Sequence, residues 1–181
     1  MKLKTKEMIT CSIFAAILCV FSVMTIPIGV VPITMGIFGV LITGVILGWK
    51  KGLISTIIFI LLGCIGLPVF SSFRGGVQVL VGPTGGYITG YILMVLFVGV
   101  ISDKIKFQQW HTVFLCLCVA CILGVIICYI FGTLQYMWIS QKTILQALAL
   151  CVYPFIPMDL LKCIAAAGLG YTIRCRLAKL I

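Results

Sequence analysis

The chain has 181 residues, of which 63% are hydrophobic and only 9% charged, and its formal net charge is +10. An ordinary soluble domain has roughly 25% charged residues, so this composition excludes a water-soluble globular protein. Long apolar stretches recur along the whole length, which is typical of a polytopic membrane protein. We therefore expect a single all-α integral membrane domain over residues 1–181.

Six apolar segments follow one another along the chain, separated by Pro, Gly and charged residues. We predict transmembrane helices over residues 8–24, 37–47, 53–65, 86–101, 112–134 and 158–177. The first has the basic start of a secretory signal but lacks a small-residue cleavage site, so we interpret it as a retained helix. Several segments are shorter than the roughly 20 residues of a full crossing. Either they are short or re-entrant stretches shielded by protein, or the helices extend beyond these limits.

The last apolar segment begins near Thr143 and is interrupted by Pro154 and Pro157. Proline removes a backbone donor and clashes with the preceding turn, so a break is expected at this point.

The positions of the basic residues predict the orientation of the six helices. With six crossings, the two termini and two of the loops lie on one side of the membrane. Of the basic residues, only Arg74, Lys142 and Lys162 then lie on the other side. Lys and Arg concentrate on the cytoplasmic side of membrane proteins, so both termini are predicted to be cytoplasmic. This distribution accounts for the net charge without a nucleic-acid partner. The basic residues assigned to the cytoplasmic side are Lys2, Lys4, Lys6, Lys50, Lys51, Lys104, Lys106, Arg174, Arg176 and Lys179.

The stretch YPFIPMDLLK places two charged residues, Asp159 and Lys162, at the start of the last apolar helix. Residues three apart project from the same face of a helix and can contact each other. One interpretation is an ion pair that neutralises itself near the membrane surface. We favour the other, a pair that lines a cavity and contacts a ligand, because polar residues within membrane spans usually mark such paths.

The stretch GPTGG, residues 82–86, precedes the fourth apolar helix. It lacks the lysine and the spacing of a nucleotide-binding loop. Pro83 suits the first turn of a helix, and the free amides of a helix N-terminus attract anions. Because the fourth and sixth helices both start on the outer side, a carboxylate ligand could bind between their N-termini.

The sequence contains few of the residue patterns that an enzyme active site or a metal site requires. Cys118 and Cys121 form a C-x-x-C pair among the ten cysteines, but the pair lies in an apolar helix without His or carboxylate neighbours. Small apolar packing residues explain such cysteines better than a metal site or a disulfide. No Ser/His/Asp set and no H-E-x-x-H motif occurs, so we predict neither an enzyme nor a metalloprotein.

Small residues recur on one face of the first helix, at Cys11, Ser12, Ala15, Ala16 and Cys19. Such a pattern lets another helix approach closely within lipid. It is equally compatible with packing inside the protein and with docking of a partner helix.

Four stretches together resemble a known family. VPITMGIFGVLITGVILGWKKG, GLPVF, GGVQVLVGPTGGYITGY and YPFIPMDLLK occur in this order. They resemble the biotin-specific S components (BioY family) of energy-coupling factor (ECF) transporters over residues 10–178. One departure is Gly36, which stands after Met35 where the family pattern leads us to expect Gln.

The resemblance implies an S-component fold of six transmembrane helices in a bacterial cell membrane. Such proteins bind a vitamin from outside and need no cofactor of their own. A transmembrane coupling (T) subunit and two ATP-binding subunits supply the energy, and the resemblance implies that the small residues of the first helix dock the coupling subunit. Two alternatives are an S component for another small vitamin and a small channel or membrane scaffold without a specific ligand.

Biotin has an apolar body, a cyclic urea with two donors and one acceptor, and a carboxylate. A site for it requires polar partners together with an apolar enclosure. The predicted polar residues are Asp159 as acceptor, Lys162 and Gln78 as donors, and Thr84, Gly85 and Gly86 with their amides or hydroxyl. The predicted aromatic residues are Phe70, Tyr87 and Tyr91.

Overall fold

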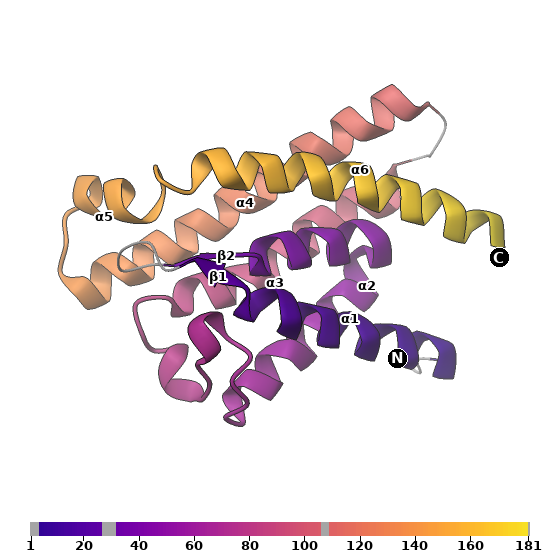
Figure 1. The fold of residues 1–181 in the computed structure, drawn as a ribbon. Coiled ribbons are helices and arrows are strands. Elements are labelled where there is room, and N and C mark those ends of the chain that lie inside the picture. Colours follow the sequence, from indigo (N-terminus) through magenta and orange to yellow (C-terminus); the bar gives the residue numbers. More distant parts are fainter. Residues whose placement is uncertain (1–3, 27–31, 106–108, 181) are drawn as a thin grey trace.

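The computed structural model describes residues 4–26, 32–105 and 109–180, of which 177–180 are described by their backbone alone. The fold is a bundle of long helices (Figure 1). The helices are α1 (Thr5–Val23), α2 (Gly36–Cys64), α3 (Gly85–Lys104), α4 (Trp110–Ser140), α5 (Ile144–Cys151) and α6 (Ile156–Leu180). Two-residue strands β1 (Thr25–Ile26) and β2 (Ile33–Thr34) pair antiparallel between α1 and α2. Apart from this strand pair, which the sequence analysis did not predict, the all-α fold is confirmed.

Helix α2 consists of two arms that meet at Gly48, where the chain turns back (Figure 1). Gly48 has φ 72° and ψ −172°, a conformation that is essentially restricted to glycine. A Cβ atom placed on Gly52 would lie only 3.7 Å from the Cα of Gly44, whereas a straight helix separates residues eight apart by about 12 Å. The two arms are therefore the separate segments predicted at 37–47 and 53–65.

Five helices of the described chain are long and apolar enough to cross a membrane, with α2 counted once. Since α2 folds back on itself, the chain runs the length of the bundle six times, as predicted. The arms of α2 remain short, but α3 and α4 extend beyond the predicted limits. The predicted break is confirmed, because turns separate α5 from α6 and Pro157 lies in the first turn of α6.

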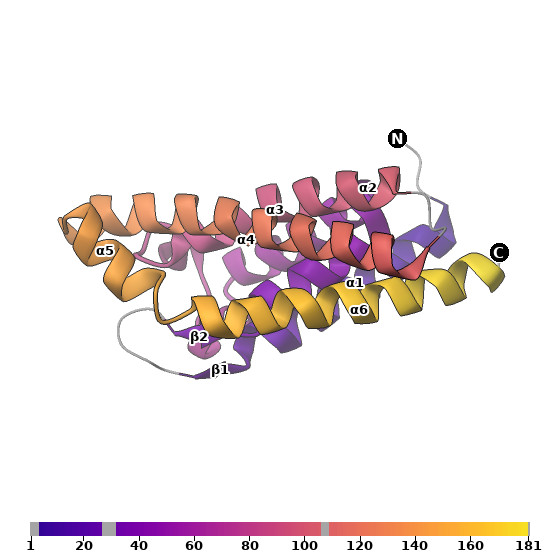
Figure 2. The same ribbon diagram turned by 90° about the horizontal axis from the view of Figure 1, so that it is seen from above.

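Polar contacts join several helices at the end of the bundle that carries both termini (Figure 2). Asp103 of α3 accepts the backbone N–H of Trp49 at 3.1 Å and pairs with Arg174 of α6 at 2.8 Å. Glu7 of α1 pairs with Lys51 at 3.4 Å. The basic residues predicted to be cytoplasmic lie on elements that meet at this end, except that Lys2, Lys106 and the side chain of Lys179 are outside the described residues.

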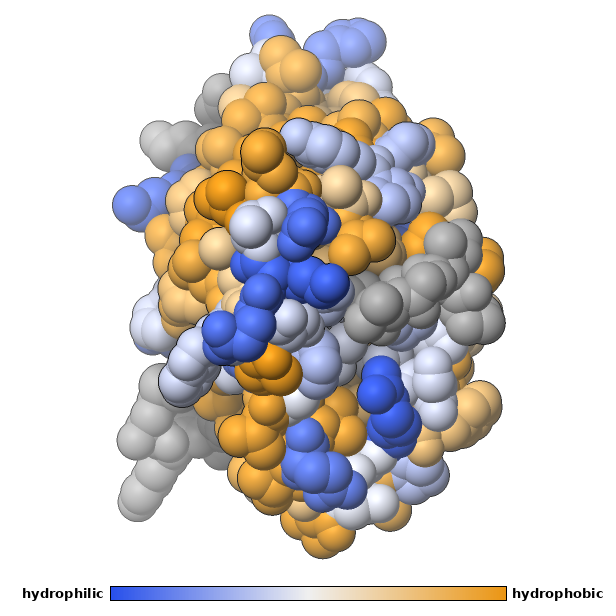
Figure 3. Space-filling model, turned by 90° about the vertical axis from the view of Figure 1, so that its left-hand side faces the viewer, coloured by the Kyte–Doolittle hydropathy of each residue, from blue (hydrophilic) through white to orange (hydrophobic). Residues whose placement is uncertain are grey.

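The opposite end carries α5, the strand pair and the segment from α2 to α3. This segment contains the 3₁₀ turns η1 (Ser71–Phe73) and η2 (Val77–Val79). Viewed onto this end, hydrophilic patches lie among apolar side chains (Figure 3). Arg74, Gln78 and Lys142 are exposed here. Large apolar side chains are exposed along the sides of the helices, as a hydrocarbon environment requires.

Candidate functional site

A buried ion pair lies in the first turns of α6. Lys162 Nζ is 2.7 Å from Asp159 Oδ1, and Asp159 and Lys162 are only 2% and 6% exposed. Lys162 also donates to the backbone carbonyl of Thr34 at 2.7 Å, and Tyr129 of α4 donates to Asp159 Oδ2 at 2.5 Å. The pair therefore connects α6 with α4 and with β2. Burying two charges is costly unless they are paired and hydrogen-bonded, and both conditions hold here.

The ion pair borders a small cavity of about 40 Å³ between the N-terminal parts of α3 and α6 and the strand β2. Thr84, at the N-terminus of α3, and Phe155, just before α6, both line it. The N-termini of α3 and α6 therefore border the same cavity, and binding of a carboxylate between them stays a prediction. The remaining polar lining consists of Ser22, Thr34, Ser71, Tyr87, Tyr91 and Tyr129.

The structure brings five of the predicted ligand-binding residues together at this cavity: Asp159, Lys162, Thr84, Tyr87 and Tyr91. Tyr87 is buried and donates to the carbonyl of Cys151 at 3.0 Å. The Tyr91 hydroxyl lies 3.5 Å from the hydroxyl of Thr34. Tyr91 therefore presents a polar group to the cavity, although the sequence analysis expected an apolar role for it.

Four other predicted residues lie elsewhere. Gln78 is exposed, donates to the carbonyl of Gly75 at 2.8 Å, and lines a separate surface recess with Arg74. Phe70 is 1% exposed and packs edge-on against Phe59 of α2, with ring centroids 5.6 Å apart. Neither residue lines the small cavity.

Gly85 and Gly86 serve close packing. A Cβ atom on Gly85 would clash with the carbonyl of Leu80, and one on Gly86 would clash with the carbonyl of Phe131 on α4. These glycines let α4 approach the start of α3, and so they position Thr84 without lining the cavity themselves.

Sequence reasoning missed Ser22, Thr34, Ser71 and Tyr129. Ser22 and Tyr129 each place a hydroxyl inside an apolar helix, and this was a usable signal because polar side chains within membrane spans tend to face cavities. Thr34 and Ser71 lie outside the long helices, and only the fold brings them to α6.

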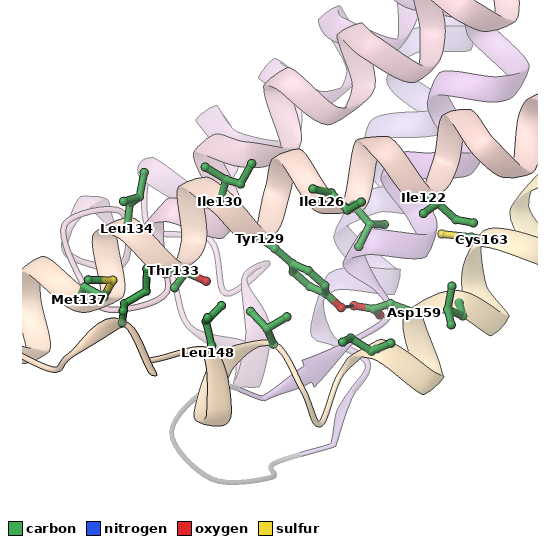
Figure 4. A pocket seen from close by; sticks show the side chains of 15 residues that line it. Ile122, Ile126, Tyr129, Ile130, Thr133, Leu134, Met137, Leu148, Asp159 and Cys163 are labelled. Atoms are coloured by element: carbon green, nitrogen blue, oxygen red, sulfur yellow. Dashed lines mark hydrogen bonds between the residues drawn. The ribbon is translucent and has the colours of Figure 1, made fainter. Parts of the chain in front are cut away.

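A larger cavity of about 490 Å³ adjoins the site between α4 on one side and α5 and α6 on the other (Figure 4). Its lining is apolar apart from Tyr129, Thr133, Asp159 and Cys163. The hydrogen bond from Tyr129 to Asp159 spans the space between α4 and α6. Tyr129 and Asp159 line both cavities and so lie at the boundary between the small polar cavity and the larger apolar one, which we call the apolar groove.

The small residues of α1 divide into two sets. Cys11 and Ala15 are buried, and the Cys11 thiol lies 3.7 Å from the carbonyl of Lys51, so these two pack against α2. Ser12 and Ala16 are exposed, and Cys19 is half-buried. The pattern thus reflects internal packing on one side and leaves a separate face of small side chains open.

All ten cysteines are free, including Cys118 and Cys121. Within residues 4–26, 32–105 and 109–180, no three His, Cys, Asp or Glu side chains gather as they do around a metal ion. The site just described offers a paired charge, several hydroxyls and aromatic walls, which is the composition of a site for a small, partly apolar organic ligand.

Comparison with known proteins identifies the class. A solved structure described as the S-component for biotin from an ECF-type ABC transporter matches with a TM-score of 0.86 and 28% sequence identity. The match covers 96% of this chain and 95% of that chain. The protein therefore has the S-component fold.

The model of the BioY family matches residues 1–179, and the chain belongs to this family. The biotin transporter BioY of Thermotoga maritima is 35% identical over 169 residues, which is 93% of this chain and 96% of that protein. The probable biotin transporter BioY of Pyrococcus horikoshii is 32% identical over 165 residues, covering 91% and 93% of the two chains. The biotin transporter BioY of Rhizobium etli is 32% identical over 181 aligned positions, covering 94% of each. These relatives are named as transporters, not as enzymes.

Proposed function

We propose that the protein is the biotin-binding S component of an ECF-type vitamin uptake transporter. The observation that carries this proposal is the small cavity with its buried Asp159–Lys162 pair, in a fold shared with an S-component for biotin. A cyclic urea needs acceptors for its N–H groups and donors for its oxygen, and the cavity offers both. The tyrosines and Phe155 provide apolar walls for the rest of the ligand.

The cavity volume of about 40 Å³ is far below the roughly 300 Å³ of a typical small-molecule site. Binding therefore requires the segments that line it to move apart. The adjoining groove is larger, but its lining offers few partners for a urea or a carboxylate.

We further propose that the protein acts in a bacterial cell membrane with both termini in the cytoplasm. It captures biotin outside and delivers it inward when docked to a transmembrane coupling subunit and two ATP-binding subunits. The open face of small side chains on α1, formed by Ser12 and Ala16, is the surface proposed for docking the coupling subunit. The partner subunits hydrolyse ATP.

Isothermal titration of the purified full-length protein with biotin tests the proposal. Other water-soluble vitamins, such as thiamine and riboflavin, serve as competitors. Saturable 1:1 binding of biotin that the other vitamins do not displace supports it. Saturable binding of another vitamin in preference to biotin would reassign the ligand within the same class. Absence of any saturable vitamin binding by the folded protein would refute the function.

A further inference from the structure

The apolar groove between α4 on one side and α5 and α6 on the other has no part in the proposed function (Figure 4). Its volume of about 490 Å³ is that of a site for a small molecule. Two of its few polar lining residues, Tyr129 and Asp159, hydrogen-bond to each other at 2.5 Å. Polar groups of an occupant would find few partners here, and burying them unpaired is costly, so the lining favours a hydrocarbon chain. Its aliphatic residues include Ile126, Ile130, Leu134, Leu148 and Ile156.

The apolar groove is continuous with the surface that the helices present to the membrane. Ile126, Ile130 and Leu134 line the groove and are 45%, 50% and 58% exposed. Apolar side chains exposed on membrane-spanning helices face hydrocarbon. The lining on α4 runs from Ile122 to Met137, about 22 Å along the helix axis, which is more than half of the roughly 30 Å hydrocarbon core. Membrane lipid therefore reaches the groove along its length.

The end of the apolar groove beside α5 carries residues that suit a lipid headgroup. Met137 and Ile144 both line the groove, so the connection between α4 and α5, residues 141–143, lies at this end. Trp138 is 79% exposed, and Lys142 is exposed as well. Tryptophan concentrates at the boundary between membrane and water, and a lysine ammonium pairs with phosphate. The groove therefore begins at the level of the headgroups, next to a cation.

We propose that the apolar groove binds one acyl chain of a membrane phospholipid, with the phosphate at Lys142 and the chain running along α4 toward Tyr129. Three observations carry the inference. The lining favours hydrocarbon, the groove is open to the bilayer, and its end at headgroup level offers a positive charge. The inference goes beyond the proposed function and does not depend on which ligand the polar cavity binds.

Native mass spectrometry of the purified, delipidated full-length protein tests this site. The probe is oleoyl lysophosphatidylglycerol, which has one chain and one phosphate, added in a short-chain detergent without phosphate. The parent protein should retain one molecule of the probe. Leu148→Trp fills the groove with an indole ring and should weaken this binding at least roughly tenfold. Leu145→Trp is the matched control, because Leu145 lies on the same helix, is 73% exposed and does not line the groove.

A second variant tests the headgroup end of the site. Lys142→Gln removes the charge at an exposed position and should weaken lysophosphatidylglycerol by roughly twofold to fivefold, the effect expected for an exposed ion pair. It should leave the binding of oleyl alcohol unchanged, because this probe has the same chain but no phosphate. Size-exclusion chromatography checks that both variants fold.

The inference is overturned if the folded parent protein retains no lysophosphatidylglycerol, or if Leu148→Trp and Leu145→Trp lose it equally. A protein dimer without lipid that Leu148→Trp abolishes would assign the groove to a second copy of the chain. If Leu148→Trp does not fold, Lys142→Gln decides, and an unchanged affinity for lysophosphatidylglycerol overturns the inference. None of these measurements uses biotin, so failure here leaves the proposed function intact, and failure of biotin binding leaves the lipid site intact.

Discussion

Tyr129 on α4 donates a hydrogen bond of 2.5 Å to Asp159 on α6, thirty positions further along the chain. Both residues line the polar cavity and the apolar groove beside it. The bond occupies the one carboxylate oxygen that Lys162 does not contact. The charge of Asp159 is thus held in position by two partners on different helices.

Removing the Tyr129 hydroxyl should impair biotin binding through Asp159. Tyr129→Phe leaves one carboxylate oxygen without its donor, and a hydrogen bond to a charged group contributes about 1.5–3 kcal/mol. We expect biotin affinity to fall by roughly ten- to a hundredfold in a titration. Tyr136→Phe is the matched control, because Tyr136 is buried on the same helix but lines neither cavity. Equal losses in both variants would contradict the specific role of Tyr129.

The Asp159–Lys162 pair should act as part of the ligand site and not only as a structural ion pair. Asp159→Asn, Lys162→Met and the double variant should each bind biotin at least roughly tenfold more weakly. A purely structural pair that is replaced on both sides leaves no unpaired charge, so the double variant would then bind normally. Titration with biotin, alongside size-exclusion chromatography to confirm folding, separates the two outcomes. Normal affinity of the double variant would assign the pair a structural role alone.

Docking of the coupling subunit should depend on the exposed small residues of α1. Ala16→Trp adds bulk to an exposed face, so it should reduce co-purification with the coupling and ATP-binding subunits severalfold while biotin binding is retained. Ala15→Trp is a poor test, because Ala15 is 2% exposed and its replacement would disturb packing against α2. Ala165→Trp places the same bulk on an exposed position of α6 and serves as the control. Undiminished assembly of Ala16→Trp would place the docking surface elsewhere.

The two ends of the bundle should be accessible from opposite sides of the membrane. Lys50 lies near the turn of α2, and Lys142 lies between α4 and α5; both are exposed. A membrane-impermeant maleimide should label Lys142→Cys in intact cells, and Lys50→Cys only after permeabilisation. The parent protein, with its ten native cysteines, sets the background. Labelling of both positions from the same side would rule out six crossings.

The sequence alone predicted the fold class closely, because membrane spans leave a strong local signal. Apolar runs and the prolines between them located the helices, and Trp49, Lys50, Lys51 and Gly52 marked the boundary between the two segments that form the arms of α2. Helix ends were less well predicted. Residues beyond position 134 continue α4 to Ser140, because helical hydrogen bonding does not stop where hydropathy falls.

The candidate site was predicted only in part. Asp159 and Lys162 stood out by themselves, because charges within an apolar helix are costly and three-residue spacing places them on one face. Gln78 and Phe70 have suitable chemistry, but the chain between α2 and α3 leaves Gln78 exposed at the surface and buries Phe70 in the core. Gly85 and Gly86 look like ligand-approaching glycines, yet they allow contact between two helices.

The sequence by itself determined that this is a membrane protein of six apolar passes with a charged pair in its last helix. Those features depend on composition and on short-range spacing, which can be read locally. Only the tertiary structure decided which residues surround that pair. Ser22, Thr34, Tyr91 and Tyr129 are distant from α6 along the chain, and each comes from a different element. They meet because the reversal at Gly48 and the close approach of α4 at Gly85 and Gly86 set the helix positions, and such contacts depend on packing in three dimensions.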